Sequence, residues 1–135
     1  MKNKGMYIRL PKARGEWAEL RFMIAATELG FRVSKPWGES GPYDLITDHR
    51  GHFYRIQVKC TLYMRDHSYV CTISSRHHPY RPSQLDFIAA YVIPTNTWYI
   101  LPLKATKGQK DLVLSPHLKN SKYKKYEESG HLLKR

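Results

Sequence analysis

Two stretches of alternating sequence, residues 43–47 and 52–61, flank the turn-prone tetrapeptide Asp48-His49-Arg50-Gly51 and predict a β-hairpin. Side chains alternate between the two faces of a strand, so the residues sort into two sets. One set is apolar and needs a covered face: Tyr43, Leu45, Tyr54, Ile56, Val58 and Cys60. Any fold of this chain must therefore bury one side of the hairpin, and a one-residue slip in register would scramble the sets.

The other face of the hairpin is polar and chemically mixed. If the turn centres between His49 and Arg50, Asp44 lies opposite Arg55. The face then collects an acid, an amide and two cations: Asp44, Arg55, Gln57 and Lys59. One interpretation is an ordinary amphipathic hairpin whose outer face is merely polar, and the other is a chemical site.

The rest of the chain predicts one helix, further strands and a second helix. Good helix formers between Gly15 and Gly30 predict the first helix. Strand-like runs follow at 31–37, 68–74, 86–93 and 97–103. Ser115 and Pro116 suit the start of a basic C-terminal helix from about residue 116. The 135 residues show no repeat or linker, so we expect a single domain, 1–135, of the α/β (α+β) class with helices packed on a sheet.

The charge of the chain indicates a polyanionic partner. Its 23 Lys and Arg against 11 Asp and Glu give a formal net charge of +12, although a basic protein without such a partner is the alternative. Cys60 and Cys71 have no Cys-x-x-Cys spacing, so neither a disulfide framework nor a zinc ribbon is predicted. The longest apolar run, 22–26, is too short to span a membrane, and we expect a cytoplasmic (intracellular) protein.

Asp44 followed by Gln57-Val58-Lys59 resembles the signature of the PD-(D/E)XK nuclease superfamily. The stretches "GEWAELRFMIAATELGFRVSKPWGESGPYDLI" and "YRIQVKCT" are similar to the intron-associated (homing-type) PD-(D/E)XK endonucleases, in which Gln replaces an acid of the third motif. The resemblance extends to about residue 103. It implies a restriction-endonuclease-like core with a central mixed β-sheet flanked by helices, in the order helix, three strands, helix, strand. It also implies a DNA endonuclease that depends on Mg²⁺ or Mn²⁺.

The chemistry of phosphodiester hydrolysis gives these residues roles. A divalent cation prefers oxygen ligands, and Asp44 and the backbone carbonyl of Val58 supply two. Lys59 is placed to stabilise charge on the phosphate, the alternative being an ordinary surface lysine. Gln57 offers an amide oxygen without charge, so another acid must compensate. The residues expected to be catalytic or to hold the metal are Glu19, Asp44, Gln57, Lys59 and Val58, with Glu39 as an outer-sphere candidate.

Glu19 is the compensating acid that a helical wheel favours. The apolar stripe of the first helix comprises Ala18, Phe22, Ala25 and Leu29, and Glu19 lies about 80° from its centre while Glu16 lies about 140° away. The resemblance agrees, since the first helix of the family carries an acid aimed at the site. Alternatively, both glutamates simply favour the helix N-terminus.

Basic and hydroxyl residues around these positions are candidates for contacts with DNA, although solvated surface is the alternative for the histidine loop and the charged tail. They are Lys35, Arg55, Thr61, Arg76, His77, Arg81, Lys122, Lys124 and Lys125. The expected partner is double-stranded or branched DNA. Because cutting both strands needs two active sites, we expect a homo-oligomer, a dimer or tetramer. Three alternatives remain: a Holliday-junction resolvase, a non-catalytic DNA-binding module with a degenerate site, and an RNA-binding or ribosome-associated basic protein.

Overall fold

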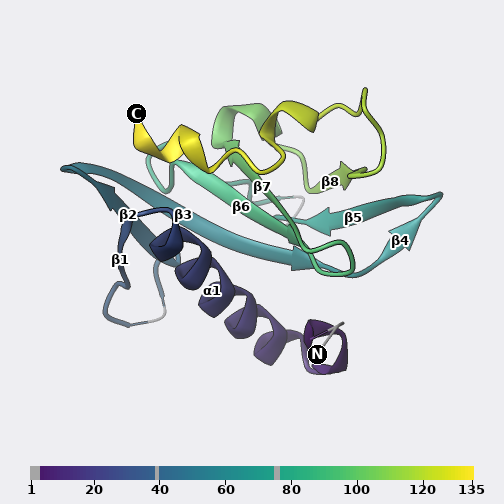
Figure 1. Ribbon diagram of the computed structural model, residues 1–135, viewed down its shortest axis with the longest axis horizontal. Helices are drawn as coiled ribbons and strands as arrows, with labels where there is room; N and C mark the ends of the chain where they lie inside the picture. The colour runs from purple at the N-terminus through teal and green to yellow at the C-terminus, as the bar shows by residue number, and fades with distance from the viewer. Residues whose placement is uncertain (1–3, 39, 75–76) are drawn as a thin grey trace.

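The computed structural model describes residues 4–38, 40–74 and 77–135 (Figure 1). Its elements, in chain order, are η1 (Lys4–Tyr7), α1 (Pro11–Glu28), β1 (Arg32–Ser34), β2 (Leu45–His49), β3 (His52–Thr61), β4 (Met64–Arg65), β5 (Ser68–Thr72), β6 (Phe87–Val92), β7 (Thr97–Pro102), η2 (Leu103–Thr106), β8 (Asp111–Leu114), η3 (Lys124–Tyr126) and η4 (Gly130–Lys134), where η marks a 3₁₀ helix.

The described strands form two sheets. The larger has the order β1-β2-β3-β6-β7, in which β3 and β6 run parallel and the other neighbours antiparallel. The smaller is antiparallel, with the order β4-β5-β8. The expectation of a central mixed sheet in an α+β fold is thus confirmed.

The two faces of the larger sheet have different covers (Figure 1). On one face α1 packs Ala18, Phe22 and Ala26 against a core that includes Leu45 and Ile56. Burying each such large aliphatic side chain contributes about 1.5–3 kcal/mol. On the other face the core is closed by the smaller sheet and by Tyr123 and Tyr126 of the C-terminal segment, whereas Leu133 of η4 joins the core on the α1 face. Within the described residues, a second sheet therefore stands where the expected architecture has a second layer of helices.

The hairpin of β2 and β3 has the predicted faces but a different register. His49 pairs with His52 and Leu45 with Ile56, so the turn centres between Arg50 and Gly51, which both have positive φ, 54° and 86°. Such a pair suits the right-handed twist of a two-residue hairpin turn. Arg55 therefore lies opposite Ile46, and the prediction that it faces Asp44 is wrong. The partner shifts by two residues, which preserves the faces: Leu45, Ile56 and Val58 are buried towards α1, and only Tyr43 packs on the other core.

The first helix begins four residues earlier than predicted, at Pro11, because proline suits the first helical turn and Gly15 is tolerated inside. Its buried positions are Ala18, Phe22 and Ala26, whereas Leu29 is exposed. The buried stripe is therefore rotated towards Glu19, which lies about 60° from its centre. Within the described chain, no helix is both long enough and apolar enough to cross a membrane.

The segment between β3 and β6 departs from the expected order of elements. The resemblance implies a helix there, but the described part of the segment contains β4, β5 and turns. Neither β4 nor β8 was expected, because two and four residues are too few for an alternating pattern to stand out.

The prediction of a basic helix from about residue 116 is wrong. Residues 115–134 form successive turns and the short helices η3 and η4. Glu128 has a positive φ of 52° and donates its N–H to the Trp98 carbonyl at 2.7 Å, while Glu127 forms a bridge to Tyr99. The backbone of this segment therefore bonds to the edge of β7, which a continuous helix would not allow.

Candidate active site

Asp44 lies directly before β2 and bonds to β3 through both its main chain and its side chain. Its N–H donates to the Ile56 carbonyl at 2.8 Å, and the Val58 N–H donates to its Oδ2 at 2.8 Å. The carboxylate thus satisfies an N–H that β2 leaves without a partner, because pairing stops at Leu45 and Ile56. In the described part of the chain its other oxygen, Oδ1, has no hydrogen bond.

The edge of β3 is open beyond this point. The N–H and the carbonyl of one residue point to the same edge of a strand, so the Val58 carbonyl faces the side on which its N–H meets Asp44. A neutral backbone oxygen therefore lies beside the carboxylate. Because β2 does not cover this edge, side chains from both faces of the sheet can approach Asp44.

A cleft of about 540 Å³ lies between α1 and the loop that precedes Asp44. Glu19 and Asp44 are both among its walls, and Lys35 Nζ donates to Glu19 Oε1 at 2.8 Å. The Glu19 side chain is 21% exposed, whereas Glu16, one turn earlier, is exposed. Lys12 also lines the cleft, so two lysines accompany the acids.

Burial, a hydrogen bond and several nearby charges all act on the pKa of Asp44. Burial raises its pKa above the ordinary value, the Val58 hydrogen bond opposes the rise, and the charge of Glu19 adds to it. Lys59 and Lys35 lower the pKa by smaller amounts. All three charged side chains thus act on Asp44, from both faces of the sheet. A carboxylate held in this way loses its proton less readily and gains from a nearby cation.

Gln57 and Lys59 project from the face of β3 opposite α1, where they meet Tyr80. Gln57 Nε2 donates to the Pro42 carbonyl at 2.7 Å and to the Tyr80 hydroxyl at 3.1 Å. Lys59 Nζ lies 5.9 Å from the centre of the Tyr80 ring. No sequence pattern singles out Tyr80, because it stands in an irregular segment 21 residues after Lys59.

The oxygens around Asp44 suit a hard divalent cation. Asp44 and Glu19 offer carboxylates, Val58 a carbonyl and Gln57 an amide oxygen, and Mg²⁺ prefers such ligands. Among the described residues no three His, Cys, Asp or Glu side chains converge into a metal cluster. The donor set therefore fits a cation held by two carboxylates and neutral oxygens and completed by water or substrate phosphate, which is how Mg²⁺ is usually bound.

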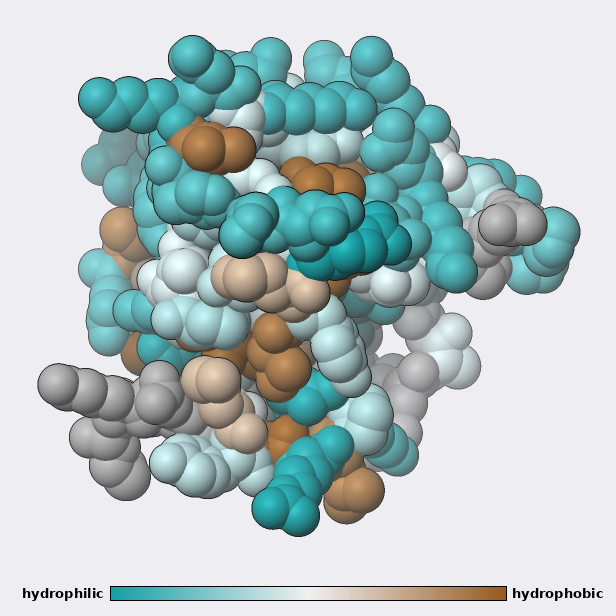
Figure 2. Space-filling model, turned by 90° about the vertical axis from the view of Figure 1, so that its right-hand side faces the viewer, coloured by the Kyte–Doolittle hydropathy of each residue, from teal (hydrophilic) through white to brown (hydrophobic). Residues whose placement is uncertain are grey.

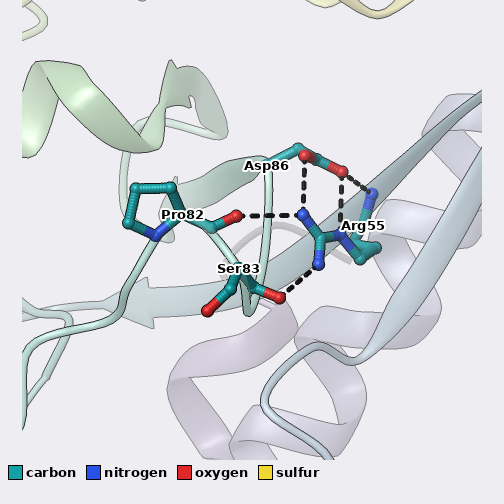
Figure 3. Close-up of polar contacts among 4 residues, drawn as sticks. All are labelled: Arg55, Pro82, Ser83 and Asp86. Carbon is teal, nitrogen blue, oxygen red and sulfur yellow. Dashed lines mark hydrogen bonds and ion pairs between the residues drawn. The ribbon is translucent and has the colours of Figure 1, made fainter.

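Arg55, a predicted DNA contact, is bound within the protein (Figure 3). Its guanidinium donates to both carboxylate oxygens of Asp86, at 3.1 and 3.0 Å, and to the Ser83 and Pro82 carbonyls, at 2.6 and 3.1 Å. Four of its five N–H donors are thereby used. Burial alone would raise the pKa of Asp86, but the hydrogen bonds from Arg55 outweigh it and lower that pKa. Arg55 therefore fastens the segment before β6 to β3.

The other residues predicted to contact DNA differ in their exposure and in their partners within the protein. Thr61 is buried and donates to the Val70 carbonyl at 2.6 Å, which leaves its hydroxyl little freedom for phosphate. His77 and Arg81 are exposed, and Lys35 pairs with Glu19 in the cleft. Arg76 and Glu39 lie outside the described residues.

The three lysines of the C-terminal segment do not join the cleft. Tyr123 and Tyr126, which neighbour these lysines, pack on the core opposite α1, so this part of the segment and the cleft lie on different faces of the larger sheet (Figure 1), whereas Leu133 of η4 packs into the α1 core. Figure 2 shows hydrophilic side chains gathered over the upper part of one side of the molecule, at the height of the segment after β8. The three lysines contact residues close to them in sequence. Lys122 lies over the Tyr123 ring, Lys125 lies over the Tyr126 ring, and Lys124 pairs with Glu127 at 2.8 Å.

Comparison with known proteins agrees with this fold. The family model of the PD-(D/E)XK endonucleases matches residues 10–129, and this chain belongs to that family. The structure is similar to that of the bacterial homing endonuclease I-Ssp6803I, with 25% sequence identity and a TM-score of 0.79, covering 93% of this chain and 91% of that one.

A second solved structure shares the fold alone. Archaeoglobus fulgidus Hjc, a Holliday junction resolvase from an archaeal hyperthermophile, is 14% identical with a TM-score of 0.59, covering 89% of this chain and 95% of that one. No curated protein matches the sequence.

Proposed function

We propose that this chain is a homing-type DNA endonuclease that hydrolyses phosphodiester bonds with Mg²⁺ or Mn²⁺. The observation that carries the proposal is the half-buried Asp44 carboxylate, with raised pKa, beside Glu19, Lys59 and the Val58 carbonyl. Membership of the endonuclease family and the similarity to a bacterial homing endonuclease support it. The net charge of +12 suits a nucleic-acid substrate.

Each residue has a role in this proposal. Asp44, Glu19, the Val58 carbonyl and Gln57 Oε1 hold the cation, which supplies Lewis-acid polarisation of the phosphate and acidifies water. Lys59 stabilises the negative charge that grows on the phosphate oxygens and orients the attacking water. Lys12 and Lys35 in the cleft attract the DNA backbone.

We also propose that residues 1–135 act as one nuclease unit and that two or more copies assemble, because cutting both strands of a duplex requires two such sites. His77, Arg81 and the lysines at 122, 124 and 125 are the remaining candidates for backbone contacts. Those lysines lie across the sheet from the cleft, so within one copy they would touch DNA at a distance from the scissile phosphate.

A cleavage assay tests the proposed function. We expect a mixed pool of supercoiled plasmid, linear duplex and four-way junction to be cut with Mg²⁺ or Mn²⁺ and left intact with EDTA. Preference for the junction would assign a resolvase activity instead. Salt-sensitive binding that is independent of metal, with no cutting even of a randomised target library, would contradict the proposal and favour a degenerate binding module.

Replacing Glu19 with Gln tests its proposed role as the second acid. The change removes one negative charge from the cation site, and we expect the concentration of Mn²⁺ needed for half-maximal cleavage to rise about tenfold or more. Glu16→Gln is the matched control: Glu16 lies one turn earlier on the same helix and also lines the cleft, but it is exposed, and Glu19 is the glutamate whose charge acts on Asp44. If both glutamates only stabilised the helix N-terminus, the two variants would behave alike and neither would change the metal requirement.

A further inference from the structure

The Gln57 amide is held in one orientation. Its two N–H donors are both used, one by the Pro42 carbonyl at 2.7 Å and one by the Tyr80 hydroxyl at 3.1 Å. A flipped amide would bring its oxygen against the Pro42 carbonyl oxygen at that short distance, which two acceptors do not tolerate. The Pro42 carbonyl therefore fixes which atom is nitrogen, and it favours an amide over a carboxylate at position 57.

This orientation leaves Oε1 free within the described part of the chain. It has no hydrogen bond there, and it is not one of the buried polar atoms without a partner, which are Arg21 Nε, Thr47 Oγ1, His49 Nδ1 and Ser121 Oγ. Oε1 is thus reached by solvent although Gln57 as a whole is 8% exposed. An amide oxygen that accepts nothing and is accessible is a ligand atom ready for a cation.

Tyr80 acts on two residues of the site at once. Its hydroxyl accepts from Gln57, and its ring lies under the Lys59 ammonium at 5.9 Å. We propose that Tyr80 is a positioning residue of the nuclease site, which turns the Gln57 oxygen outwards as a neutral cation ligand and steadies Lys59. The part of this inference that concerns the cation rests on the proposed function, whereas the orientation of the amide does not.

The clamp made by Arg55 explains what holds Tyr80 in place. Tyr80 lies in an irregular segment, and the carbonyls two and three residues later, those of Pro82 and Ser83, accept from the Arg55 guanidinium (Figure 3). Arg55 and Gln57 project from the same face of β3, so the strand that carries the amide also anchors the segment that orients it. Arg55 therefore acts on the site through Tyr80.

Nuclear magnetic resonance of the full chain tests the inference without cleavage. The side-chain amide resonances of Gln57, assigned by their loss in Gln57→Met, are followed in metal-free wild type and in Tyr80→Phe, and Mn²⁺ is then titrated while their line broadening is measured. In Tyr80→Phe we expect one of the two amide protons to shift and to exchange faster with water. We also expect Mn²⁺ to bind about tenfold more weakly, the usual effect of losing a partner of a ligand.

Tyr123→Phe is the matched control, because the Tyr123 hydroxyl also bonds to a glutamine, Gln109, at 3.3 Å, and this glutamine lies just before β8 rather than on β3. It should move the Gln109 resonances only. Unchanged Gln57 resonances and Mn²⁺ affinity in Tyr80→Phe would overturn the inference and leave the proposed function standing. If wild type showed no Mn²⁺ broadening of Gln57, the amide would not be a ligand; if no resonance near Asp44 broadened either, the proposed function would fail as well.

Discussion

Asp44→Asn is expected to reduce cleavage by at least about a hundredfold while making the protein more stable at neutral pH. Mutation of a residue that merely hydrogen-bonds to a metal ligand typically lowers metal affinity or activity by about 10–100-fold, and removal of a charged ligand itself should lower activity further. The substitution retains an oxygen that can accept the Val58 N–H, which is now bonded at 2.8 Å. The measurement is the cleavage rate with saturating Mg²⁺, together with denaturant unfolding of the metal-free protein.

The stability effect has a definite sign. The pKa of Asp44 is raised in the folded state, chiefly by burial, so folding favours its protonated form. Its stabilising contribution is complete below the ordinary pKa of 3.8 and is lost as pH rises through the raised pKa. The free energy of unfolding of Asp44→Asn should therefore exceed that of wild type at pH 7, and the difference should shrink on acidification.

Asp48→Asn is the control for this variant. Asp48 lies in β2, the strand that Asp44 directly precedes, and it also accepts a backbone N–H, from Gly51 at 2.9 Å, but it lies at the turn end of the hairpin. Its cleavage rate should stay within about twofold of wild type, as expected away from the site. A cleavage rate for Asp44→Asn equal to that of Asp48→Asn would show that Asp44 is not a metal ligand.

The hairpin could be predicted well because two local rules agree in it. The alternation of side chains assigned Leu45, Ile56 and Val58 to the buried face, and the length of the alternating stretch set β3 at residues 52–61. The turn was harder, since Arg50 adopts positive φ and is not one of the residues that usually signal it. An error of one residue in the turn moved the partner of Arg55 by two and left the faces unchanged.

The C-terminal segment was mispredicted because the decisive interactions are distant in sequence. Ser115, Pro116 and the lysines fit a helix locally. In the structure Tyr123 is buried in the second core and Glu128 donates to the carbonyl of Trp98, 30 residues earlier. Local propensity is a weak prior, and tertiary contacts of this kind override it.

Contacts between residues distant in sequence also limited the prediction of the candidate site. Glu19, Asp44, Gln57 and Lys59 could be chosen from spacing and resemblance, because strands and helices have fixed periods. Tyr80 could not, since contacts distant in sequence, among them the Arg55–Asp86 clamp and the packing of Tyr80 on the core opposite α1, bring its irregular segment over β3. The clamp also binds Arg55 within the protein, which no periodicity could have indicated.

Lys59→Met is expected to reduce the cleavage rate at saturating DNA by about a hundredfold or more, with DNA affinity changed by only a few fold. Removing one group that stabilises transition-state charge typically costs 10²–10³ in kcat. Loss of a single phosphate contact, in contrast, weakens DNA binding modestly. It also lowers the slope of the logarithm of the binding constant against the logarithm of the salt concentration by about one. Methionine retains much of the aliphatic stem that approaches Tyr80, so packing is largely preserved. Single-turnover cleavage and salt-dependent binding separate the two effects.

Lys134→Met gives this prediction a closely matched comparison. Lys134 Nζ lies over the Phe31 ring at 5.9 Å, the distance that separates Lys59 Nζ from the Tyr80 ring. Both substitutions remove one positive charge and one cation–π contact, but Phe31 belongs to the α1 core. If the two variants cut equally fast, Lys59 contributes only general positive charge. A loss confined to Lys59→Met means that its ammonium acts where Asp44 does, since its field already reaches that carboxylate across the open edge of β3.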